Sequence, residues 1–133
     1  MTDLTGTMTP REVASQVAHA IRALNELTSG GGELTGPRDV HDIIASLELV
    51  GQGLPQLCEH LARFLVTKHE DGQLMHESGL DPDGSVTEVI EALAAAGQAA
   101  DMMTAALSEA RTATHVLSPA RYEQFKGRPS LEP

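Results

Sequence analysis

Residues 86–113 read VTEVIEALAAAGQAADMMTAALSEARTA and repeat small and apolar side chains at intervals of seven. One column of the repeat consists of Ala92, Ala99, Ala106 and Ala113, and the neighbouring column consists of Val86, Leu93, Ala100 and Leu107. Seven-residue spacing keeps each column on one face of an α-helix, and small side chains let a second helix approach closely. The stretch therefore predicts a long helix that another helix covers.

The ends of this helix are indicated by the residues around it. Ser85-Val86-Thr87-Glu88 has the pattern of a capping box, which predicts the start of the helix there. The residue before a proline avoids helical geometry, so we expect the helix to end near Ser118, which precedes Pro119.

A second long helix is expected to begin at Pro37 and to run to the polar connector at residues 69–84. Its apolar side chains also form two seven-residue columns, Val40, Leu47, Leu54 and Leu61, and Ile43, Val50, Leu57 and Phe64. Pro55 removes one backbone hydrogen bond and its ring clashes with the carbonyl of Gly51. Because the columns keep their phase across Pro55, we expect a kink there rather than two abutting helices.

A shorter helix is expected near the N-terminus. Thr9-Pro10-Arg11-Glu12 combines a capping box with proline at the first helical position. The apolar residues that follow share one face: Val13, Val17, Ala20, Leu24 and Leu27. The helix should end near Thr28, because the glycines at residues 30–32 have low helical propensity.

These elements predict an all-α fold. We expect an antiparallel hairpin of two long helices with the shorter N-terminal helix laid along it, a three-helix, coiled-coil-like bundle over residues 9–118. Residues 1–8 are expected to be a flexible N-terminus, and residues 119–133 a tail that contains a short helix.

The composition narrows the classes of function. The chain has 9 Lys and Arg against 19 Asp and Glu, a formal net charge of −10, which disfavours nucleic acid and anionic membrane surfaces as partners. Cys58 is the single cysteine and has no partner for an internal disulfide. The first residues lack the pattern of a secretory signal, and no apolar run is long enough to span a membrane. A cytoplasmic protein is the expectation.

One group of residues is a candidate for metal binding, and its spacing does not match a known metal-binding motif. The connector holds several possible metal ligands, namely His69, Glu70, Asp71, His76, Glu77, Asp81 and Asp83. From Asp81 onward it resembles the start of a calcium loop, but the sixth position is Val86 instead of glycine and the twelfth is Ala92 instead of glutamate. We therefore expect a solvated acidic connector, with a weak metal site as the alternative.

The remaining motifs also fail to indicate a reaction. No nucleophile and base are paired in sequence, and no glycine-rich loop is followed by the lysine of a phosphate site. Thr9–Ala14 resembles the opening of helix-turn-helix domains over six residues, but the helical pattern continues where that motif turns. We expect a protein that is not an enzyme and that has no cofactor and no metal.

The most direct functional hypothesis is a non-enzymatic protein that acts through protein–protein contacts, either with itself as a homo-oligomer or with a regulatory or adaptor partner. Leu49 and Val66 lie off the main apolar stripe of the second helix. Tyr122 and Phe125 place two of the three aromatic side chains in the tail. These four residues are the candidate partner-binding residues.

Two alternatives remain open from the sequence. The paired long helices resemble, in outline, the small substrates of type VII secretion, which would imply a leaderless exported protein. The chain lacks the Trp-x-Gly turn of that family, and Lys126 stands where its export signal after Tyr122 requires an acidic residue. The negative charge alone suggests an acidic regulator of a basic or DNA-binding partner.

Overall fold

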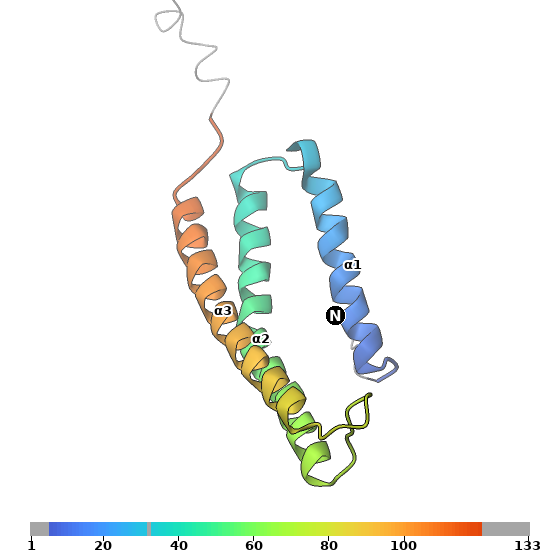
Figure 1. Cartoon of the computed structure of the whole chain (residues 1–133). Coiled ribbons are helices and arrows are strands. Elements are labelled where there is room, and N and C mark those ends of the chain that lie inside the picture. Colours follow the sequence, from blue (N-terminus) through green and yellow to red (C-terminus); the bar gives the residue numbers. More distant parts are fainter. Residues whose placement is uncertain (1–5, 32, 121–133) are drawn as a thin grey trace, which may run out of the picture. The chain divides into compact units, whose positions relative to one another are not determined.

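A computed structural model describes residues 6–31 and 33–120, and its elements are helical (Figure 1). The α-helices are α1 (Pro10–Thr28), α2 (Pro37–Glu70) and α3 (Asp83–His115), and a 3-10 turn, η1 (Ser29–Gly31), follows α1. No strand occurs in the described ranges, and the predicted all-α class is confirmed. Within the described residues, contacts divide the chain into two compact units, one that ends at residue 36 and one that begins at residue 37, which are described separately below.

The first unit contains α1, whose start follows the sequence prediction. The backbone N–H of Glu12 donates to Thr9 Oγ1, and the backbone N–H of Thr9 donates to Glu12 Oε1, both at 3.1 Å. These are the two reciprocal bonds of a capping box. The bond from the Thr9 backbone lowers the pKa of the Glu12 carboxyl, because it favours the charged form. The helix ends at Thr28 as expected.

The second unit begins with α2, which starts at Pro37 as predicted and continues through Pro55 without a break. The alternative of two abutting helices is therefore excluded. The helix ends in a Schellman motif: Gly72 has φ +70°, its N–H donates to the carbonyl of His69, and the N–H of Gln73 donates to that of Lys68. Glycine adopts this left-handed conformation without steric cost.

The predicted boundaries of α3 are wrong by a few residues at each end. The helix begins at Asp83, so Ser85 lies inside its first turn and does not cap it. Asp81 Oδ1 accepts the backbone N–H of Asp83 at 3.0 Å, and Pro82 already has helical dihedral angles, so the helix starts before the serine. It ends at His115, short of Ser118.

Helices α2 and α3 pack side by side as an antiparallel hairpin (Figure 1). The buried and half-buried positions follow alternating steps of three and four on each helix, and we call these two rows the inner seam. On α2 the inner seam consists of His41, Ile44, Glu48, Gly51, Pro55, Cys58, Ala62, Leu65 and His69. On α3 it consists of Val86, Ile90, Leu93, Gly97, Ala100, Thr104, Leu107, Arg111 and Thr114.

Of the four columns predicted from the sequence, one lies on the inner seam and faces the other helix, and the other three do not. The column that contains Val86 and Ala100 faces α2, and these two side chains are only 8% and 6% exposed. The alanine column of α3 is not covered by α2, because each of its four members is exposed. The two apolar columns predicted for α2 also lie outside the inner seam. The inner seam instead contains Gly51 and Gly97, where the two helices come into close contact.

The two helices make close contact at two glycines of the inner seam. A Cβ atom at Gly97 would lie 3.5 Å from the Cα atom of Pro55, an ordinary van der Waals distance. A Cβ atom at Gly51 would overlap the side-chain oxygen of Thr104, which donates a hydrogen bond to the carbonyl of Ala100 at 2.8 Å. The hairpin therefore has space for a methyl group at residue 97 and none at residue 51.

We expect Gly97→Ala and Gly51→Ala to change stability in opposite directions. Alanine is the better helix former, so Gly97→Ala should raise the free energy of unfolding by up to about 1 kcal/mol. Gly51→Ala should lower it by about 1–3 kcal/mol, because Thr104 must move to accommodate the added methyl group. Urea denaturation followed by circular dichroism measures both, and equal changes for the two variants would contradict the close approach at residue 51.

Candidate protein-interaction surface

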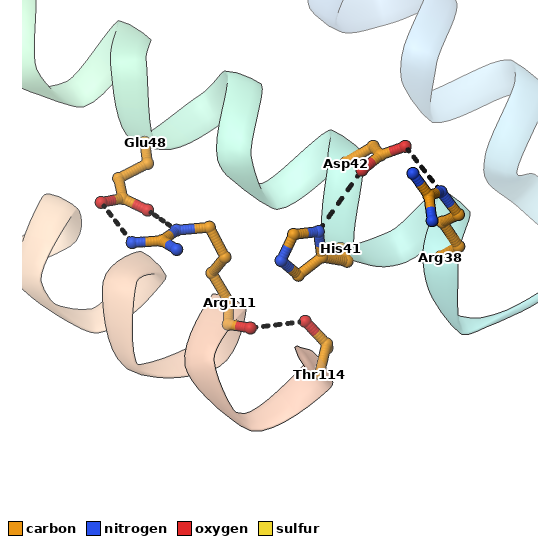
Figure 2. A network of polar contacts seen from close by, with 6 residues as sticks. All are labelled: Arg38, His41, Asp42, Glu48, Arg111 and Thr114. Atoms are coloured by element: carbon orange, nitrogen blue, oxygen red, sulfur yellow. Dashed lines mark hydrogen bonds and ion pairs between the residues drawn. The ribbon is translucent and has the colours of Figure 1, made fainter. Parts of the chain in front are cut away.

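One ion pair crosses the inner seam between residues far apart in sequence. Arg111 Nε donates to Glu48 Oε1 at 2.6 Å, and Arg111 Nη2 donates to Glu48 Oε2 at 3.4 Å (Figure 2). The Glu48 side chain is 11% exposed and that of Arg111 38%. The hydrogen bond from Arg111 lowers the pKa of Glu48, and Glu48 raises the pKa of Arg111. The pair places residue 48 of α2 opposite residue 111 of α3.

Further polar side chains gather where α2 begins and α3 ends (Figure 2). His41 Nδ1 lies 3.3 Å from Asp42 Oδ1, and the imidazole rings of His41 and His115 are 5.9 Å apart between centroids. The Thr114 hydroxyl donates to the carbonyl of Arg111 at 2.8 Å. A cavity of about 410 Å³ adjoins these residues. His41, Asp42 and His115 all line this cavity at the end of the hairpin.

The connector at the other end of the hairpin was the alternative metal site. His69 Nε2 lies 2.5 Å from Asp83 Oδ1, so two of the candidate ligands meet. Within residues 6–31 and 33–120, no group of three or more His, Cys, Asp or Glu side chains is arranged to hold a metal ion. Of the three apolar residues of the connector, Leu74 is half-buried, whereas Met75 and Leu80 are exposed.

A second row of residues on each helix precedes the inner seam by one position and is apolar except at its end beside the connector, where Lys68 lies on α2 and Ser85 on α3. On α2 its apolar part consists of Val40, Ile43, Leu47, Val50, Leu54, Leu57, Leu61 and Phe64. On α3 its apolar part consists of Val89, Ala92, Ala96, Ala99, Met103, Ala106, Ala110 and Ala113. Each row again alternates steps of three and four, which is the spacing of a helix-packing seam.

The two rows lie on the same broad side of the hairpin. A step of one residue toward the N-terminus rotates a position by about 100° around its helix. Because α2 and α3 are antiparallel, this step turns clockwise on one helix and anticlockwise on the other when both are viewed from the same end. Both rows therefore turn to one side, and Met103 of the α3 row reaches the neighbourhood of Gly51 on α2. We call these sixteen residues the uncharged face.

Most side chains of the uncharged face are exposed on the α2–α3 hairpin, and Ile43, Leu47, Leu54 and Ala110 are half-buried. The side chains of Leu57 and Phe64 are 49% and 59% exposed, and Val50, Leu61, Val89 and Met103 are also exposed. Contiguous exposed apolar surface of this kind marks interaction sites in proteins. None of the helices in the described ranges combines the length and the apolar composition needed to cross a membrane.

Of the four partner-binding residues predicted from the sequence, the two that the structure describes, Leu49 and Val66, do not come together. Leu49 is 68% exposed and Val66 is half-buried. Each follows an inner-seam residue by one position, so both turn to the side of the hairpin opposite the uncharged face. They are about 25 Å apart along α2 at 1.5 Å per residue. Tyr122 and Phe125 lie outside the described residues.

The sequence analysis took the apolar columns of α2 for the side that faces α3, although the sequence also allowed them to form a separate surface. Both long helices carry two adjacent rows with steps of three and four, and only one row of each can face the other helix.

Comparison with known proteins does not assign a function: no protein-family model, no curated protein and no solved structure matches the chain.

Proposed function

We propose that this chain is a non-enzymatic, cytoplasmic helical protein that acts through protein–protein contacts, and that the uncharged face is its contact surface. The observation that carries the proposal is the exposure of large apolar side chains in the α2 row of the uncharged face, among them Leu57 and Phe64. Burying such side chains contributes about 25 cal/mol per Å² of apolar surface removed from water.

The distribution of charge supports this choice of surface. The whole chain carries a formal net charge of −10, yet no residue of the uncharged face is ionisable. The core of a protein–protein interface is depleted in charged residues, which surround it at the rim. The free thiol of Cys58 in the inner seam is consistent with a reducing compartment.

The experiment compares two leucines on opposite sides of α2. Affinity-tagged full-length wild type, Leu57→Glu and Leu49→Glu are used to recover bound proteins from the source cells, with quantification by mass spectrometry. We expect wild type and Leu49→Glu to recover the same partners, including untagged copies of the chain where they are present. Leu57→Glu is expected to lose them at least tenfold.

Two other outcomes would contradict the uncharged face as the contact surface. If Leu49→Glu loses the partners and Leu57→Glu retains them, binding uses the side that contains Leu49 and Val66. If both variants behave as wild type, the uncharged face is not the contact surface. Circular dichroism of each variant checks that the helices remain folded.

A further inference from the structure

We infer that the occupant of the uncharged face is a second copy of this chain, packed face to face so that α2 of each copy lies against α3 of the other. This inference rests on the proposed function and narrows it to one partner. It follows from the size, charge and side-chain volumes of the uncharged face.

The dimensions of the face match a second hairpin. From Val40 to Phe64 the α2 row spans about 36 Å at 1.5 Å per residue, and two helices side by side are about 20 Å wide. The face thus offers about 700 Å² per copy, close to the roughly 800 Å² per partner of stable specific interfaces. A single helix with the 19 residues of α1 would span about 28 Å and half of that width.

The two rows of the face complement each other in volume. The α2 row contains valine, isoleucine, leucine and phenylalanine, whereas the α3 row contains six alanines with Val89 and Met103. A two-fold axis along the length of the hairpin places the large row of each copy against the small row of the other. In such an isologous interface both contacts are the same, and small side chains let the helix axes approach closely.

Charge selects this face among the surfaces of the hairpin. Two copies with a formal net charge of −10 each repel one another, so their contact must exclude ionised side chains. The opposite side carries Asp42, Glu59, Glu91 and Asp101, with Arg63 paired to Glu59, so a symmetric contact there would bring net negative charge from both copies together. The uncharged face avoids this repulsion.

The first test is the oligomeric state of the full-length chain by sedimentation equilibrium at 1–100 μM, a range of about two decades that covers ordinary homodimers. We expect wild type to be a dimer and Ala99→Glu to be a monomer with unchanged helical content. Ala99 is exposed in the single hairpin, so the variant does not bury a charge within one copy. Ala95→Glu, on an exposed position of the same helix outside the face, should remain a dimer.

The second test is the orientation of the two copies. A spin label at Gln73, exposed beside the turn, is introduced as Gln73→Cys in a Cys58→Ser background. The proposed axis puts both turns at the same end, so pulsed electron resonance should give a distance of about 30 Å or less. If α2 instead lay against α2, the turns would be at opposite ends, about 50 Å apart for helices of this length.

The outcomes separate this inference from the proposed function. A monomeric wild type, or a dimer that Ala99→Glu and Leu57→Gln leave intact, overturns the inference, and a distance near 50 Å overturns the orientation. If the wild type is a monomer but Leu57→Glu still abolishes recovery of another protein from cells, the proposed function stands with a different partner. Should Ala99→Glu lose helical content, Leu57→Gln alone decides the dimer interface.

Discussion

Ala100→Glu should lower the free energy of unfolding of the α2–α3 hairpin by about 3–5 kcal/mol, the range seen when a buried charge is left without a partner. Ala100 is 6% exposed and lies on the inner seam, where α2 covers it. A glutamate there must either remain buried or force the helices apart. Urea denaturation monitored at 222 nm measures the loss, which is a large fraction of the stability of a small domain.

Ala95→Glu provides the matched control for this prediction. It adds the same side chain to the same helix at an exposed position. Its effect should stay within about 0.5 kcal/mol, of which a few tenths come from repulsion by Glu91 four residues earlier. Similar losses for both variants would mean that α3 does not turn Ala100 toward α2.

The sequence predicted the helices and their pairing because those features depend on local or strongly periodic signals. The capping box at Thr9 and Glu12, the start of α2 at Pro37 and the antiparallel hairpin all appear in the structure. The start of α3 was misplaced because two capping patterns overlap. Asp81 precedes Ser85 and satisfies a backbone amide of the first turn earlier in the chain.

The sequence did not determine which side of each helix faces the other. Two adjacent rows on α2 have the same spacing, and hydrophobicity alone predicts that the row of larger apolar residues forms the core. The structure pairs the row that contains Gly51 and Pro55 with the row that contains Gly97 and Ala100. A Cβ atom at Gly51 or Gly97 would meet Thr104 or Pro55 of the other helix, and hydrophobic periodicity alone does not reveal such contacts.

The ion pair across the inner seam is a second feature that could not be predicted from the sequence. Glu48 and Arg111 are separated by 63 positions, and each reads separately as an ordinary surface charge on an amphipathic helix. Their pairing is recognisable only once the register of the hairpin is known. The same register places Leu49, the neighbour of Glu48, on the side away from the uncharged face. The position of α1 along the hairpin stays a prediction.

Arg111→Met should destabilise the hairpin more than Glu48→Met, with a fall in Tm of roughly 5 °C or more for the arginine variant. Removing Arg111 leaves the carboxylate of Glu48, the more buried of the two side chains, without its partner. Removing Glu48 leaves a guanidinium that already reaches solvent. The double variant Glu48→Met/Arg111→Met should be more stable than Arg111→Met alone, because no unpaired charge remains.

The pH dependence of stability tests the same pair independently. Arg111 lowers the pKa of Glu48 below its ordinary value of 4.5. A lowered folded-state pKa contributes stability that is fully present above the unfolded-state pKa and is lost as pH falls through the lower folded value. The difference in Tm between wild type and Glu48→Gln should therefore be largest at neutral pH and shrink below about pH 4.5. A difference that is constant across this range would mean that the carboxylate of Glu48 is not held by Arg111 in solution.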